Sequence, residues 1–257
     1  LFFVRRQPED LGLPPDGGPS PVSTSPAAAP SASHPAAPAP AAADERSWTR
    51  REAVRSGTFW RLVFVFSIVM LAVNSVGVHR IPSFMDRGLE PRVISYATAL
   101  DAAAAGLSTF AMGFLAQRVP ARLIGTGGFL MLALASWLTI IAADHSVMFV
   151  AMISFGLGIG VLMLMQNYLW AEYFGRQHLG SIRGAVMPIT LICGGLGAPL
   201  SGYVRDITGD YTPVWLTATG LMVLGGIIIA LTPPPRAKPA RTSVAPAVPV
   251  GAAEERS

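Results

Sequence analysis

The stretch that decides the fold runs from Val147 to Trp170 and reads VMFVAMISFGLGIGVLMLMQNYLW. It contains no charged residue, and its apolar residues do not form the single stripe at 3.6-residue spacing that is typical of a soluble helix. About twenty such residues are enough to cross a hydrocarbon core about 30 Å thick. The stretch therefore predicts a transmembrane helix.

Five more stretches of this kind lie on either side of it. The chain as a whole is 51% hydrophobic and only 13% charged, whereas soluble domains carry about a quarter of charged residues. We therefore predict an all-α membrane protein whose transmembrane domain covers 58–232. Its six predicted spans are 58–79, 94–116, 123–142, 147–170, 184–204 and 213–232.

The segments outside this domain are predicted from their composition. Residues 1–6 consist of four apolar residues followed by two arginines, and we expect them to be the end of a preceding transmembrane helix. Residues 7–57 are rich in proline and alanine and are predicted to be a disordered cytoplasmic linker, because such a composition buries too little apolar surface to offset the entropy of ordering. We expect the same of the tail, 233–257.

The placement of the arginines predicts the orientation in the membrane. If the linker is cytoplasmic, the outer side holds only four of the nineteen basic residues, namely Arg80, Arg87, Arg92 and Arg205. An excess of basic residues on the inner side is the rule for membrane proteins, so both ends of the chain are predicted to be cytoplasmic. Lys238 is the sole lysine. This bias towards arginine suggests GC-rich coding and a bacterial inner (plasma) membrane.

A glycine and two arginines lie around the turn after the second predicted span. Residues 113–122 read GFLAQRVPAR, which resembles the loop motif G-x-L-a-D-R-x-G-r-k of the major facilitator superfamily. Gln117 stands where the family has Asp, and Pro120 stands where it has its second Gly. A generic basic hairpin on the cytoplasmic side is the alternative. The matching residues are Gly113, Leu115, Ala116, Arg118 and Arg122.

Three further stretches, 5–17, 171–184 and 197–211, resemble motifs of the oxalate/formate- and monocarboxylate-type members of that superfamily. The resemblance implies the C-terminal half of a major facilitator fold, with six helices arranged as two inverted three-helix repeats, 58–142 and 147–232. It also implies that the third and sixth helices are peripheral and that the other four line a central cavity.

Polar side chains within the spans are the candidates for that cavity, because amides and charges inside a membrane mark a water-filled path. They lie in the first, second and fourth spans, and the candidates for substrate binding and proton coupling are Asn74, Asp101, Gln166 and Asn167. Because Gln166 and Asn167 are neighbours on one helix, one of them is expected to contact another helix instead.

Asp101 is the strongest of these candidates. It lies about four residues, or roughly 6 Å, to the outer side of its helix midpoint, where a carboxylate costs about 2.5–3.5 kcal/mol. Burial disfavours the charged form, so Asp101 is a candidate proton carrier. Monocarboxylate transporters often carry an arginine one turn later, but Ala105 stands there. The alternative is an Asp101 bonded to Tyr96 or to an N-terminal half. His79 and Arg80 end the first span and are expected at the outer interface.

Two further groups of residues are assigned by position. The resemblance implies that charges at the cytoplasmic helix ends form ion pairs that close the inner gate, and these are Arg118, Arg122, Glu172 and Arg183. Membrane anchoring of the same charges is the alternative. Small residues let helices approach closely, and the expected packing glycines are Gly113, Gly156, Gly160 and Gly197.

Taken together, these features predict a secondary active transporter that moves a small organic anion such as a monocarboxylate by alternating access with protons. A membrane receptor or assembly subunit on the same fold is the alternative. The four histidines form no ligand set and Cys193 is the sole thiol, so we expect no enzyme, metal or cofactor. The expected partners are the substrate, protons, the lipid bilayer and either a missing N-terminal six-helix half or a second copy, with no nucleic acid.

Overall fold

The computed structural model describes residues 48–235 of the chain. The predicted preceding helix at 1–6, most of the predicted linker and nearly all of the predicted tail lie outside the described residues. The described part is helical throughout, and its helices are α1 (Arg50–Val54), α2 (Gly57–Asp86), α3 (Pro91–Leu115), α4 (Ala121–Ile141), α5 (His145–Phe174), α6 (Leu179–Thr208) and α7 (Thr212–Ala230).

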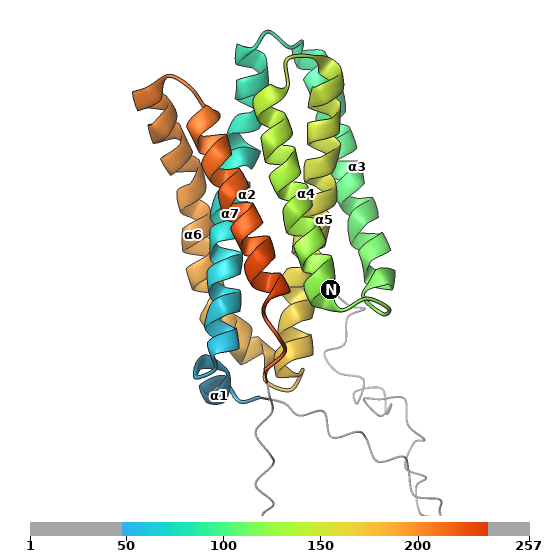
Figure 1. The fold of residues 1–257 in the computed structure, drawn as a ribbon, viewed down its shortest axis with the longest axis vertical. Helices are drawn as coiled ribbons and strands as arrows, with labels where there is room; N and C mark the ends of the chain where they lie inside the picture. Colours follow the sequence, from blue (N-terminus) through green and yellow to red (C-terminus); the bar gives the residue numbers. More distant parts are fainter. Residues whose placement is uncertain (1–47, 236–257) are drawn as a thin grey trace, which may run out of the picture. The chain divides into compact units, whose positions relative to one another are not determined.

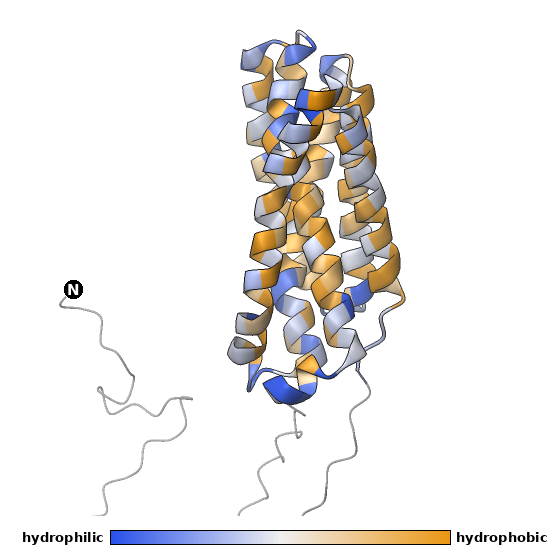
Figure 2. Ribbon diagram, turned by 90° about the vertical axis from the view of Figure 1, so that its left-hand side faces the viewer, coloured by the Kyte–Doolittle hydropathy of each residue, from blue (hydrophilic) through white to orange (hydrophobic). Residues whose placement is uncertain are grey.

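The six long helices α2 to α7 stand side by side, joined by short turns (Figure 1). Each is long and apolar enough to cross a membrane, which confirms the prediction of an all-α membrane protein with six spanning helices. Hydrophobic residues occupy most of their length, and the most hydrophilic residues lie mainly toward the two ends (Figure 2). We call the end that holds α1 and the beginning of α2 the α1 end, and the opposite end the far end.

The first long helix continues beyond its predicted limit at residue 79. Pro82 lies inside α2, and the helix runs on to Asp86. A proline removes one backbone hydrogen bond, here to the carbonyl of Val78, and such a loss is tolerated where neighbouring helices support the chain. Arg80 is therefore an internal residue of α2, and the expectation that it ends the helix is wrong.

A short helix occupies part of the predicted linker. Thr49 and Glu52 form a capping box at the start of α1, an arrangement that satisfies backbone donors at both residues. Trp48 anchors this segment, because its backbone N–H donates to the carbonyl of Phe174 (2.9 Å) and its ring packs edge-on against that side chain. The prediction of disorder is therefore wrong for residues 48–56, where the Ala/Pro-rich composition has already given way to a capping signal.

The helices pack in an arrangement that repeats itself. Helix α3 packs on α5 and helix α6 packs on α2, while α4 lies between α5 and α7, and α7 lies between α4 and α2. Exchanging α2, α3 and α4 for α5, α6 and α7 leaves this set of neighbours unchanged. Because α2 starts at the α1 end and α5 starts at the far end, the two three-helix units are inverted, as the resemblance implies.

Glycines set the two closest helix pairs. A Cβ on Gly156 or Gly160 of α5 would overlap the backbone of α3, and a Cβ on Gly197 of α6 would overlap the backbone of α2. Hydroxyl groups fasten the same contacts, because Ser108 donates to the carbonyl of Leu157 (2.7 Å) and Ser75 donates to that of Gly197 (2.9 Å). The space around Gly113 is open, so the packing role expected for Gly113 has no counterpart among the described residues.

Candidate substrate-binding site

A buried ion pair joins the first two long helices. Arg80 on α2 donates from Nη2 to Oδ2 of Asp101 on α3 at 2.5 Å, and the two side chains are only 8% and 14% exposed. The guanidinium also lies over the ring of Phe155 on α5, 4.1 Å from its centroid. Asp101 therefore has an arginine partner after all, supplied by a neighbouring helix and not by position 105.

The ion pair leaves polar atoms without partners. Nε and Nη1 of Arg80 and Oδ1 of Asp101 are buried and make no hydrogen bond with any described residue. An unsatisfied donor or acceptor of a buried charged group is costly. The guanidinium thus retains two unpaired donor atoms. A ligand carboxylate could bind it in a bidentate manner once Asp101 releases Nη2, because both bidentate edges of a guanidinium include that atom.

Helix α5 packs against both members of this ion pair. Gly156 lies so close to α3 that a side chain there would overlap the carbonyl of Asp101, and the preceding residue, Phe155, covers Arg80. Helices α2 and α3 otherwise make few contacts with each other. The ion pair is therefore the main polar link between them, and its geometry depends on where α5 packs.

A cavity lies nearer the α1 end, between α2, α5 and α6. Its volume is about 460 Å³, and its lining is mostly apolar. The polar groups that line it are Asn74, Gln166, Arg183 and Thr190. Arg80 and Asp101 are not among the lining residues, and Arg80 lies six residues beyond Asn74 on α2, which is about 9 Å along the axis.

The residues predicted for one cavity therefore divide into three places. Asn74 and Gln166 share the cavity, while Asp101 is paired with Arg80 farther toward the far end. Asn167 is exposed and its side chain donates to the carbonyl of Met163 (3.0 Å), so it does not line the cavity.

The four predicted gate residues all lie at the α1 end. Arg118 follows α3 and Arg122 is in the first turn of α4. Glu172 is in the last turn of α5, and Arg183 is in the second turn of α6. None of the ion pairs found in 48–235 joins two of them. Arg183 also lines the cavity, so its charge lies at the cavity wall as well as near the helix end.

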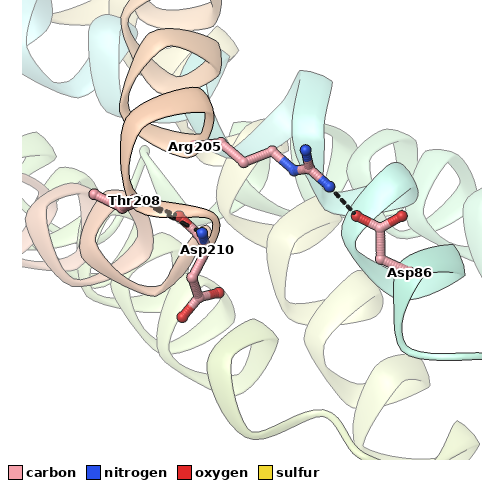
Figure 3. Close-up of polar contacts among 4 residues, drawn as sticks. All are labelled: Asp86, Arg205, Thr208 and Asp210. Atoms are coloured by element: carbon pink, nitrogen blue, oxygen red, sulfur yellow. Dashed lines mark hydrogen bonds and ion pairs between the residues drawn. The ribbon is translucent and has the colours of Figure 1, made fainter.

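A polar cluster at the far end was not predicted. Arg205 on α6 forms an ion pair with Asp86 at the end of α2 (2.9 Å), and Thr208 donates to the backbone carbonyl of Asp210 (2.9 Å; Figure 3). Arg87 donates from Nη1 to the carbonyls of Thr139, Ile140 and Ala142, which end α4. The cluster therefore links the far ends of α2, α4 and α6.

Two groups of this cluster lie in the loops and have shifted pKa values. Burial lowers the pKa of Arg87, an effect that the negative charge of Asp210 partly opposes. The pKa of Asp210 is lowered chiefly by a hydrogen bond with the side chain of Thr212. The sequence signal for this cluster is the gathering of acidic and basic residues in 86–92 and 205–210.

Three relatives of this chain are named as monocarboxylate transporters. Monocarboxylate transporter 13 of Rattus norvegicus is 26% identical over 185 residues, which cover 68% of this chain and 42% of the relative. Monocarboxylate transporter 13 of Bos taurus is 27% identical, over 69% of this chain and 42% of the relative. Monocarboxylate transporter 11 of Homo sapiens is 32% identical, over 63% and 38%.

The chain thus spans less than half of the length of these relatives. All three are mammalian, so they lend no support to the bacterial membrane predicted from the arginine bias. The family model described as Major Facilitator Superfamily matches residues 81–254, which is more than half of the 257 residues. With six apolar helices in two inverted repeats and this match, the chain is an integral, multi-pass membrane protein that belongs to the Major Facilitator Superfamily.

Proposed function

We propose that the chain is one six-helix half of a secondary transporter that moves a small monocarboxylate together with a proton by alternating access. The observation that carries this proposal is the buried Arg80–Asp101 pair with its unpaired donors. The names of the relatives, monocarboxylate transporters 13 and 11, favour the same substrate class.

The chemistry of the pair explains why a proton and an anion would travel together. When Asp101 takes up a proton, it no longer neutralises Arg80, whose guanidinium keeps its charge. A substrate carboxylate then replaces the Asp101 carboxylate as the counter-ion of Arg80. Because an unpaired charge is costly at this depth, neither the proton nor the anion binds well without the other.

The remaining candidate residues take supporting roles in this proposal. Asn74 and Gln166 bind the substrate in the cavity before its carboxylate reaches Arg80, and Arg183 attracts the anion at the α1 end. We place the α1 end in the cytoplasm of a bacterial cell, where Arg118, Arg122, Glu172 and Arg183 pair and separate as one bundle rocks against the other. A second six-helix unit, either an N-terminal half or a second copy, supplies the opposite wall.

The test is uptake of radiolabelled lactate by proteoliposomes that contain the complete protein, with and without an inward proton gradient. We expect Asp101→Asn to lose the stimulation by the gradient while still exchanging lactate for lactate, because a neutral side chain leaves Arg80 available. Arg80→Gln should lose both activities. Glu90→Gln removes an exposed carboxylate that precedes α3, the helix of Asp101, and makes no ion pair with any described residue, so it should leave both unchanged. Gradient-stimulated uptake by Asp101→Asn at the wild-type rate would refute the coupling role.

A further inference from the structure

A groove on the outside of the bundle, between α3 and α4, is separate from the cavity between α2, α5 and α6. It has a volume of about 490 Å³ and lies between α3 and α4, with α5 as its floor. Its walls come from two stretches, Leu107–Leu115 of α3 and Leu123–Met131 of α4, and its floor is formed by Leu157 and Val161. Each wall rises about 12 Å along its helix, which is less than half of a hydrocarbon core about 30 Å thick.

Glycines explain why the groove exists. A Cβ on Gly128 would overlap Val161, and a Cβ on Gly160 would overlap the carbonyl of Ala105, so α4 and α3 are each drawn close to α5. The two helices make little contact with each other. Gly127, next to Gly128, lines the groove and has open space around it.

The groove suits an apolar chain. Leu107 and Leu123 on its rim are more than half exposed, and its one hydroxyl, that of Ser108, is already used in donating to the carbonyl of Leu157. No polar group in the groove therefore needs a partner. The groove lies along helices that are long and apolar enough to cross a membrane. In a membrane, the apolar chains available to fill it are the acyl chains of lipids.

Two arginines lie beside the α1 end of the groove. Arg118 and Arg122 are exposed and are adjacent in the chain to the lining residues Val119 and Leu123. They are the sole charged residues between Asp101 and Asp144. Neither makes an ion pair with any described residue. Basic residues beside a gap between transmembrane helices favour anionic lipid head groups.

We propose that this groove binds an anionic phospholipid, with one acyl chain between α3 and α4 and the phosphate against Arg118 and Arg122. Because its walls are about 12 Å long, the groove holds part of one acyl chain within one leaflet. The negative head group lies at the α1 end. This site places a lipid beside α5, which also positions the Arg80–Asp101 pair, but it does not depend on the proposed transport activity.

The test measures phospholipids retained by the purified full chain after incubation with phosphatidylglycerol or phosphatidylcholine in detergent, by native mass spectrometry. Gly127→Leu fills the groove, so the acyl chain loses its buried contacts. The amount of phosphatidylglycerol retained should fall by about tenfold or more. Gly220→Leu is the matched control, because Gly220 is an exposed glycine of α7 that also has open space around it, and it should retain lipid as the wild type does.

Arg118→Gln with Arg122→Gln tests the head-group contact without touching the packing. This variant should bind the two lipids equally, with the preference for phosphatidylglycerol lost. Equal retention of phosphatidylglycerol by the wild type, Gly127→Leu and the double arginine variant would overturn the proposal. It would also be overturned if Gly127→Leu changed the oligomeric mass and not the lipid content, because the groove would then hold a second copy of the chain.

Discussion

Arg80 and Asp101 each need the other in order to be buried. A buried ion pair adds little net stability, because desolvation offsets the attraction, but removal of one partner leaves an uncompensated charge. Here the guanidinium is also covered by Phe155, so water reaches it poorly. Removal of one charge of the pair should therefore be more destabilising than removal of both.

Single and double substitutions of the pair should differ in stability. Arg80→Gln leaves the Asp101 carboxylate without its partner, and we expect a loss of about 3 kcal/mol in the free energy of unfolding. Adding Asp101→Asn should recover most of it, because no charge then remains buried. Thermal unfolding in detergent provides the measurement, with Arg92→Gln, an exposed arginine of α3, as the control. Equal destabilisation by the single and double variants would show that packing, and not charge, explains the loss.

The sequence predicts a functional role for Asp101 but not for Arg80. Asp101 stands out as a lone carboxylate in an apolar span, and its candidacy needed no structure. Arg80 looked like a residue of the helix end, because it follows His79 and precedes Pro82 by two positions. Its role depends on a contact with Asp101, which lies 21 residues later in the chain, on the next helix. No local sequence pattern encodes such a contact.

At the scale of the helices, glycine positions decide which pairs approach closely. Gly156 and Gly160 are spaced by four residues and lie on one side of α5, and both meet the backbone of α3. The spacing was sufficient to predict close packing for these two. The same residue type did not predict it for Gly113, because nothing in the glycine itself tells which side of a helix has a neighbour.

Gly156 offers a direct test of this packing. Gly156→Ala places a methyl group against the carbonyl of Asp101, and we expect a loss of about 2 kcal/mol in unfolding free energy from overpacking. Gly113→Ala meets open space and should be neutral or stabilising by up to about 1 kcal/mol, because alanine favours helix. Melting temperatures of the two purified variants distinguish the cases. A destabilised Gly113→Ala together with an unaffected Gly156→Ala would contradict the packing described here.

At the scale of the whole molecule, burial is distributed unevenly over the helices. In the most apolar window of each helix, 56% of the residues of α2 and α5 are buried, against 11% for α3 and 22% for α6. Helices α3 and α6 each pack on one inner helix, so their remaining sides are exposed. We expect a second six-helix unit to cover the exposed sides of α6 and the side of α3 that faces away from the groove.

Labelling of single cysteines tests this expectation. In a Cys193→Ser background, Ile192→Cys on α6 and Ile227→Cys on α7 replace isoleucines that are 65% and 51% exposed. If a second unit covers α6, a nitroxide spin label on Ile192→Cys should collide with dissolved oxygen, which concentrates in lipid, several-fold less often than one on Ile227→Cys in reconstituted membranes, as expected for a site buried in an interface. Equal collision rates in membranes would mean that both positions face lipid.

What the sequence determined by itself follows from composition and local order. Hydrophobic runs of membrane length specify the six helices, and short motifs specify the family, because both depend on neighbours along the chain. Only the tertiary structure decided that Arg80 pairs with Asp101, that Asn74 and Gln166 share a cavity which Asn167 does not line, and that α3 and α4 leave a groove between them. Each of these depends on which faces of different helices meet. That is set by packing around small residues, whose partners lie far away in the sequence.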